Sequence, residues 1–273
     1  DAGDHFVLEA GATVDALRDI LINTDYDVLT TDDRRGGDVT IAGDMITRGV
    51  TETVTTEGLI DYDVVTDGDV IIRTSLVGDD TVNITGLLTI ARDFVLDTYA
   101  GDDATTIQTD LSAANIRIRT GLDNDLLDIK GDVSAFGYLG SAWVAPETET
   151  DIAKAERAAL QRGDVIVDFG DDRDPQDEFL LSGNITALRD IRFYKLPEVQ
   201  HVALQRDVYT VRSGFGLFVE DAGAAQAITS SVEDTMALAN VSGRGQITAA
   251  AETFEGLRAG DLLRVTQGGA VQQ

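Results

Sequence analysis

Acidic residues recur along the chain in short clusters, mostly beside glycine. The clusters are Asp32–Asp33, Asp67 with Asp69, Asp79–Asp80, Asp102–Asp103, Asp123 with Asp125, and Asp171–Asp172 with Asp174 and Asp177. Aspartate beside glycine is typical of turns. Carboxylates that lie close together repel one another, and a hard divalent cation removes that repulsion. The clusters therefore predict turns that bind calcium, because calcium accepts carboxylate oxygens in a flexible geometry that magnesium does not tolerate.

The candidate calcium ligands are eight aspartates from four of these clusters: Asp79, Asp80, Asp102, Asp103, Asp123, Asp125, Asp171 and Asp172. The competing interpretation is that these aspartates only form turns on a solvated acidic face. High surface acidity also keeps proteins from marine or saline surroundings soluble.

Other catalytic or metal-binding side chains are scarce. The chain has no Cys, 2 His and 1 Trp, which excludes thiolate metal sites and cysteine nucleophiles and disfavours zinc or copper. A catalytic histidine could only be His5 or His201, and neither lies in a recognisable motif. We therefore expect no catalytic residues, no cofactor other than calcium, and no enzyme activity.

An Arg–Asp dipeptide occurs three times, at Arg18–Asp19, Arg92–Asp93 and Arg189–Asp190. A catalytic pair is normally unique, whereas a repeated pair indicates a structural device. We expect these residues to form salt bridges between successive segments of the fold.

The aspartate clusters belong to an internal repeat. Three segments share an apolar strand, a threonine and a Gly/Asp turn, and Thr74, Thr98 and Thr120 mark equivalent positions 24 and 22 residues apart. Residues 80–93 also align without a gap on residues 177–190. A period of this length made of short strands predicts coils that stack about 4.8 Å apart and bury apolar residues against one another.

The predicted fold class is all-β: a parallel β-solenoid (β-helix) with coils of about 22–24 residues and one short inserted helix. In the coil that follows Asp80, we expect Val82 and Ile84 to point inward and Thr81 and Asn83 outward. An antiparallel β-sandwich is the alternative, because its strands also recur at short, regular intervals.

The predicted organisation has four parts: solenoid coils in residues 1–145, a helical insertion in 146–162, further coils in 163–213, and C-terminal strands, a cap or an assembly region in 214–273. The helix is expected because Thr150 or Asp151 can cap its start and Gly163 can end it.

The turns resemble a known family. The segments Gly78–Ile84, Gly101–Ile107 and Leu122–Ile129 resemble degenerate hemolysin-type (RTX-like) repeats and the long-coil β-helices of secreted bacterial surface proteins and adhesins. The resemblance covers residues 63–135 and part of 163–195, although the strict nonapeptide never occurs intact. It implies calcium-dependent folding outside the cell.

Charge and hydropathy limit the kinds of partner that the chain can have. The chain has 49 Asp and Glu against 21 Lys and Arg, a net charge of −28, which repels phosphate backbones and argues against a nucleic-acid partner. Its apolar runs are too short to span a membrane. The chain begins at Asp1 without a charged and apolar leader, so we expect a mature chain or an excised fragment.

We expect a secreted, extracellular structural protein at the cell surface: a calcium-binding subunit of a bacterial surface layer, filament or adhesin. Open strand edges favour self-assembly into a polymer or layer, and a cell-surface polysaccharide is a second candidate partner. Two alternatives stay open. One is a polysaccharide-acting β-helix enzyme, a lyase or glycosidase. The other is an ice-binding solenoid with an outward row of Thr74, Thr98 and Thr120.

Overall fold

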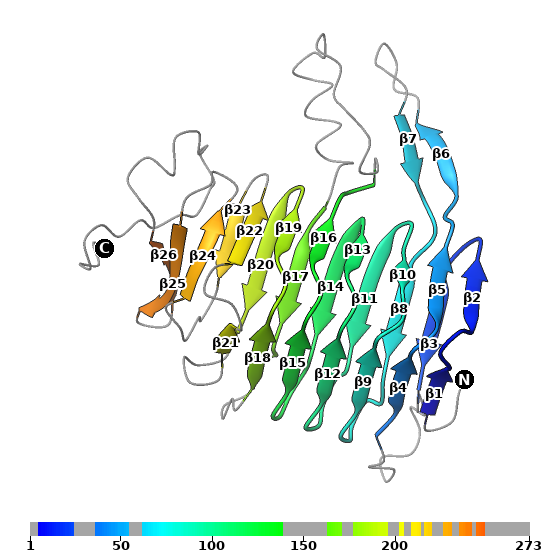
Figure 1. The fold of residues 1–273 in the computed structure, drawn as a ribbon, viewed down its shortest axis with the longest axis horizontal. Coiled ribbons are helices and arrows are strands. Elements are labelled where there is room, and N and C mark those ends of the chain that lie inside the picture. The colour runs from blue at the N-terminus through cyan, green and yellow to red at the C-terminus, as the bar shows by residue number, and fades with distance from the viewer. Residues whose placement is uncertain are drawn as a thin grey trace.

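The structure is a computed structural model, and its strands lie side by side in a long stack (Figure 1). It describes residues 5–24, 36–54, 62–138, 163–170, 177–195, 202–204, 209–213, 216–219, 226–230, 235–241 and 244–248. The regular secondary structure in this part of the chain consists of β-strands alone, so the fold is all-β. Within the same residues no helix has the length and hydropathy needed to cross a membrane. The helix expected at 146–162 lies outside the described residues and stays a prediction.

Most strands belong to three sets of parallel strands, which we number sheets I, II and III. Sheet I contains β1 (His5–Leu8), β4 (Asp38–Ile41), β9 (Thr81–Ile84), β12 (Ala104–Ile107), β15 (Leu126–Ile129), β18 (Glu178–Leu181) and β21 (Val202–Leu204). Sheet III contains β3 (Ile20–Asn23), β8 (Val70–Arg73), β11 (Asp93–Asp97), β14 (Asn115–Arg119), β17 (Val165–Asp168), β20 (Asp190–Tyr194) and β23 (Gly216–Val219).

Sheet II has two runs of strands. The first contains β2 (Thr13–Ala16), β5 (Asp44–Thr47) and β10 (Leu88–Thr89). The second contains β13 (Leu111–Ala113), β16 (Val133–Ala135), β19 (Ile185–Ala187), β22 (Tyr209–Ser213), β24 (Gln226–Ser230), β25 (Thr235–Val241) and β26 (Arg244–Thr248). The two runs adjoin where β10 contacts β13.

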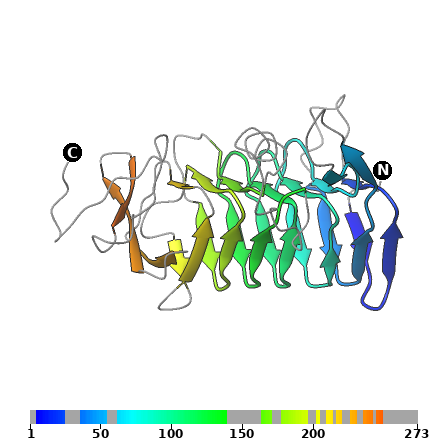
Figure 2. The same ribbon diagram turned by 90° about the horizontal axis from the view of Figure 1, so that it is seen from above.

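The chain visits sheets I, II and III in turn, and we call one such passage a coil. Partner strands come from successive coils and run parallel: Phe94 of β11 pairs with Val70 of β8 on one side and Ile116 of β14 on the other. Figure 2 shows the resulting stack from above. This all-β, largely parallel arrangement is consistent with the predicted solenoid and overturns the antiparallel sandwich.

Alternation along each strand explains why these short segments form sheets. In β9, Val82 and Ile84 are fully buried, whereas Thr81 is exposed and Asn83 is half-buried, as predicted. β-branched and aliphatic residues suit such strands, because one face of the sheet packs on the core while the other meets water. The inward residues form one continuous apolar core enclosed by the three sheets.

Close contact between coils requires glycine at the turn from sheet I to sheet II. A Cβ atom on Gly131 would lie 2.1 Å from the carbonyl oxygen of Thr109 in the preceding coil, and one on Gly183 would lie 1.9 Å from the carbonyl oxygen of Gly131. No side chain fits at those distances, so the backbones of these coils approach each other only at glycine.

Two features depart from the repeat, and the sequence did not predict the first of them. β6 (Thr51–Val54) and β7 (Tyr62–Val65) form an antiparallel hairpin between β5 and β8, projecting from the stack (Figure 1). The second is the antiparallel pairing of β24 with β25 and of β25 with β26, in the segment where the sequence predicted C-terminal strands or a cap.

The glycine contacts give a stability prediction. Gly131→Ala should destabilise the fold by about 2–3 kcal/mol, because the added methyl group forces the two coils apart. Gly11→Ala is the matched control: Gly11 has a positive φ of 81° but no atom within 4 Å of a Cβ, so only the backbone strain of about 1 kcal/mol applies. Urea unfolding measures both values, and equal losses for the two variants would contradict the close approach.

Candidate functional site in the stacked turns

Four aspartates form a buried column at the turn from sheet III to sheet I. We call Asp80, Asp103, Asp125 and Asp177 the inner aspartate column, because each side chain lies inside the turn and each residue is at most 3% exposed. They come from four successive coils, just before β9, β12, β15 and β18. The alignment of residues 80–93 on 177–190 is thus confirmed, since Asp80 and Asp177 occupy equivalent places.

Backbone N–H groups hold this column together. Asp103 Oδ1 accepts a hydrogen bond from the Asp80 N–H at 2.8 Å, and Asp125 Oδ1 accepts one from the Asp103 N–H at 3.1 Å. Asp177 Oδ1 accepts the Asp125 N–H at 2.9 Å. Asp80 in turn accepts the Gly37 N–H and the hydroxyl of Ser75. Each carboxylate therefore ties its own coil to the preceding one.

Burial makes the charged form of these carboxylates costly. It raises the pKa of Asp80, and it raises the pKa of Asp103 to about 8, assisted by repulsion from Asp80 and Asp125. The hydrogen bond from the Asp80 N–H opposes the shift without cancelling it. Asp103 Oδ2 is buried without a hydrogen-bond partner in the described chain. Asp103 therefore holds a proton at neutral pH when no cation is bound.

A threonine column lies in the same turn. Thr74 Oγ1 donates to the carbonyl oxygen of Thr98 at 3.1 Å, and Thr98 Oγ1 donates to that of Thr120. The predicted stacking is therefore confirmed. The outward direction that the ice-binding alternative requires is wrong for these residues, since all three are at most 1% exposed. The hydroxyls of Thr74 and Thr98 satisfy backbone carbonyls inside the turn. The ice-binding alternative therefore lacks the exposed row that it requires.

An exposed column runs beside the inner one. Asp79 Oδ1 accepts the Asp102 N–H at 3.0 Å, and Asp102 Oδ1 accepts the backbone and side-chain N–H groups of Asn124 at 3.1 and 3.2 Å. Asp123 is exposed and has a positive φ of 80°, which a turn aspartate tolerates. The structure therefore places Asp79 and Asp102 together, one coil apart.

The candidate calcium ligands thus divide into two groups. Asp80, Asp103 and Asp125 lie in the buried column, and Asp79, Asp102 and Asp123 lie at the surface of the same turns. No group of three or more His, Cys, Asp or Glu in the described chain is arranged to hold a metal ion. In the inner column Oδ1 of each aspartate already accepts an N–H group, which leaves at most one oxygen of each carboxylate for a cation. Asp171 and Asp172 lie outside the described residues.

The Arg–Asp dipeptides meet carboxylates of a neighbouring segment at the turn from sheet II to sheet III. Arg92 Nη1 lies 3.5 Å from Asp69 Oδ2, and Arg189 forms two hydrogen bonds with Asp164. Arg18 Nη1 lies 3.2 Å from Asp67 Oδ2. The expected salt bridges are confirmed, and the repetition shows that the pair serves the stack.

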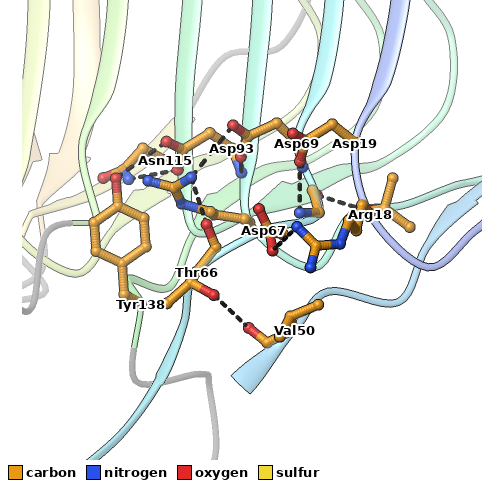
Figure 3. A network of polar contacts seen from close by, with 12 residues as sticks. Arg18, Asp19, Val50, Thr66, Asp67, Asp69, Asp93, Asn115 and Tyr138 are labelled. Atoms are coloured by element: carbon orange, nitrogen blue, oxygen red, sulfur yellow. Dashed lines mark hydrogen bonds and ion pairs between the residues drawn. The ribbon is translucent and has the colours of Figure 1, made fainter. Parts of the chain in front are cut away.

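A second ladder of carboxylate and amide groups runs through this turn (Figure 3). Asp19 Oδ1 accepts the Gly68 and Asp69 N–H groups at 2.8 and 2.9 Å, and Asp69 Oδ1 accepts the Asp93 N–H at 3.0 Å. Asp93 Oδ1 accepts the Asn115 side-chain amide at 2.7 Å. The neutral Asn115 interrupts the run of carboxylates, which resumes in the next coil with Asp164.

Arg92 is the centre of a cluster that the repeat alone does not produce. Its Nη1 donates to the Thr66 carbonyl oxygen at 2.7 Å, beside the β6–β7 hairpin, and its guanidinium lies 5.1 Å from the ring centroid of Tyr138. Tyr138 donates its hydroxyl to Asp93 Oδ2 at 3.0 Å, and its carbonyl oxygen accepts the Val65 N–H. We call Arg92, Tyr138, Asp93 and Thr66 the Arg92 cluster; it fastens the hairpin to the stack.

No sequence signal points to Tyr138, because it follows β16 outside any strand and has no repeated counterpart. Burial, followed by the nearby Asp93, raises the pKa of Tyr138. The hydroxyl therefore stays protonated and acts as a donor. Of the two histidines, His5 lies on the surface with its Nδ1 3.3 Å from Asp38 Oδ2, and His201 falls beyond the described part of the chain.

Comparison of the chain with protein-family models, curated proteins and solved structures finds no match. The arrangement itself must therefore carry any functional conclusion.

The inner column predicts an inverted pH dependence. Between pH 4 and 8, folded Asp103 keeps a proton that the unfolded chain, with an ordinary pKa of 3.8, releases. Raising the pH through this range should therefore lower the free energy of unfolding, by up to about 1.4 kcal/mol per pH unit. Asp103→Asn keeps an oxygen that accepts the Asp80 N–H but has no titratable proton. The free energy of unfolding of this variant should therefore change less with pH. Urea unfolding with a chelator present measures this, and equal slopes would contradict a protonated Asp103.

The Arg92 cluster predicts a contrast between two arginines. Arg92→Ala should cost about 2 kcal/mol, because it removes the donor to the Thr66 carbonyl and the positive partner of Asp69 in a partly buried site. Arg48→Ala should cost less than about 1 kcal/mol, because the Arg48–Asp15 pair is solvent-exposed. Thermal unfolding compares them, and a larger loss for Arg48→Ala would show that Arg92 is not an anchor.

Proposed function

We propose that this protein is an extracellular structural protein: a parallel β-solenoid, with coils of about 22–24 residues, that acts as a scaffold subunit of a surface layer, filament or adhesin. One observation carries the proposal. Like residues stack over like residues in successive coils, and their polar groups bond to the coil before or after. The Asp80–Asp103–Asp125–Asp177 column is the clearest case.

This use of polar groups supports a passive role. An enzyme concentrates its reactive groups at one unrepeated place. Here the arginine and aspartate that most resemble catalytic groups, Arg92 and Asp93, recur as Arg189 and Asp190, and they make the same kind of contact to the neighbouring coil. The groups that suggested a lyase or glycosidase therefore have a structural explanation.

Free strand edges support assembly. Among the described strands, β1 and β3 are the outermost strands of sheets I and III at one end of the stack, and β21 and β23 are outermost at the other. An outermost strand has unpaired backbone groups that another strand of parallel direction can satisfy. End-to-end contact between copies would continue both sheets.

Calcium stays the predicted cation of this scaffold. The resemblance of the turns to hemolysin-type repeats supports it, and so does the repulsion among carboxylates stacked one coil apart in a chain of charge −28. The exposed Asp79 and Asp102 retain access to water, so we propose the cation at this outer column and not at the inner one. An extracellular location follows from the same proposal.

Electron microscopy and thermal unfolding of the full chain with and without calcium test the proposal. With calcium we expect end-to-end assemblies and a raised Tm, because cations neutralise the repulsion between copies. Addition of a chelator should dissociate the assemblies and lower the Tm. If chelation changes neither, the cation is not part of the function.

Two proline variants test the strand edge. Ile20 donates its N–H to the Asp69 carbonyl, so the N–H of the next residue, Leu21, faces the free edge of β3. Leu21→Pro should abolish end-to-end assembly while keeping most of the stability, whereas Ile22→Pro, which removes a bond to β8, should destabilise the fold. Assemblies that persist in Leu21→Pro would contradict growth from this edge.

A further inference from the structure

The outward face of sheet III has an ordered charge pattern that the stacking does not use. Backbone register places Arg73, Asp97, Arg119 and Asp168 in one column, on the successive strands β8, β11, β14 and β17. Their charges alternate strictly from strand to strand. We call these four residues the sheet III charge column.

Within one molecule these charges are poorly paired. Arg119 lies between two aspartates, and its nitrogens are 3.7 Å from Asp97 Oδ1 and 3.7 Å from Asp168 Oδ2, too long for hydrogen bonds. The Arg73 side chain has no ion pair or hydrogen bond to any described residue. The side chains of Asp168 and Arg119 are 27% and 36% exposed, so they have capacity for further contacts. Asp97 is 13% exposed, and its Oδ1 is buried without a hydrogen-bond partner in the described chain.

The order of the charges makes the column complementary to itself when it is reversed. Read from β8 to β17 it is plus, minus, plus, minus; read in the opposite direction it is minus, plus, minus, plus. Consider a second copy related by a two-fold axis that lies between β11 and β14 and runs parallel to the strands. It would place its Asp168 opposite Arg73 and its Arg119 opposite Asp97. Such a contact is isologous, with the same patch on both copies.

The neighbouring column on the same face suits this arrangement. It contains Leu21, Ile71, Val95, Arg117, Ile166 and Arg192 in register. Under the same two-fold axis, Ile71 lies opposite Ile166 of the second copy, and Val95 lies opposite the aliphatic stem of Arg117. Leu21, which is 55% exposed, lies opposite Arg192. Apolar contacts thus flank the charge pairs.

We propose that the outward face of sheet III binds a second copy of this chain, with the two stacks side by side and antiparallel. A parallel pair would place Arg73 against Arg73 and Asp97 against Asp97, which like-charge repulsion disfavours. The contact goes beyond the proposed end-to-end assembly and does not depend on it, because it uses a sheet face and not the strand edges.

The size of the face sets the strength of the contact. The strands of sheet III, spaced about 4.8 Å apart and four to five residues long, make a face of roughly 30 by 15 Å. This is smaller than the roughly 800 Å² per partner of a standard stable interface. We therefore expect a weak dimer that forms at high protein concentration, and charge complementarity should select its orientation more than it strengthens it.

A charge swap tests the pairing. In chelator and at about 0.15 M salt, where screening limits the general repulsion between copies, sedimentation velocity of the wild-type chain should show a monomer–dimer equilibrium. Arg73→Asp alone and Asp168→Arg alone should each weaken dimerisation about tenfold or more, because like charges then face each other. An equimolar mixture of the two variants should restore it, since the mixed dimer pairs each charge correctly.

Arg48→Asp is the matched control. It makes the same change in net charge as Arg73→Asp, directly after β5 and away from sheet III, and should leave the dimer unchanged. Loss of dimers in Arg48→Asp, or no recovery in the mixture, would overturn the proposal. So would a wild-type chain that stays monomeric in chelator at the highest concentration reached. Circular dichroism of each variant shows whether it folds.

Cysteine cross-linking tests the orientation independently, because the chain has no cysteine of its own. A mixture of Ile71→Cys and Ile166→Cys chains should cross-link between the two variants, and neither variant should cross-link with itself. Self-cross-linking of Ile71→Cys would indicate a parallel pair and contradict the proposal. Electron microscopy of the same samples after addition of calcium distinguishes the two proposals: dimers without end-to-end assemblies contradict only the scaffold proposal, and end-to-end assemblies without dimers contradict only this contact.

Discussion

The parallel pairing of each strand with the strand one coil away is the constraint on which the rest of this structure depends. It places every residue about 4.8 Å from its counterpart in the next coil. Apolar residues that lie over apolar residues bury each other, and the columns of Val, Ile, Leu and Phe form a single core. Polar and charged residues must instead find a partner in the same narrow column, so the stack decides which polar residues each turn tolerates.

Aspartate columns show how that difficulty is resolved without a partner of opposite charge. In the inner column, Oδ1 of each aspartate accepts an N–H from the preceding coil, and burial favours a proton on Asp103. At the turn from sheet II to sheet III the same problem has a different solution, because Arg92 and Arg189 supply positive charge and Asn115 replaces a carboxylate. The carboxylates of Asp79 and Asp102 in the exposed column also accept N–H groups, but they stay open to water, and this is where we propose the cation.

The repeated parts of the molecule could be predicted from the sequence. The spacing of Thr74, Thr98 and Thr120 gives the coil length, and the alternation in Thr81–Ile84 gives the inward face. The Arg–Asp repeats give the salt bridges. These predictions succeed because the same residue pattern recurs in several coils. A pattern that recurs is distinguishable from the chance variation of a single turn.

Features that depend on direction or on a single occurrence could not be predicted. Threonine suits both a water-facing row and a buried turn, and only the hydrogen bond from Thr74 to the Thr98 carbonyl decides between them. The inner aspartates have the same ambiguity. Their sequence pattern predicts calcium ligands, and it does not distinguish a buried aspartate from an exposed one. The β6–β7 hairpin interrupts the repeat once, and Tyr138 meets Arg92 only because the fold returns to the same turn.

The most direct test of the stacking is disulfide formation between cysteines placed on the outward face of sheet II. Ser112 of β13 pairs in register with Ser134 of β16, and Thr186 of β19 lies one strand further on. Neighbouring strands bring Cα atoms within the range that a disulfide spans, whereas strands two apart, at roughly 10 Å, do not. Oxidation of Ser112→Cys/Ser134→Cys should give an intramolecular disulfide, and Ser112→Cys/Thr186→Cys should give none. A disulfide in the second variant and not in the first would show that successive coils are not stacked in this register.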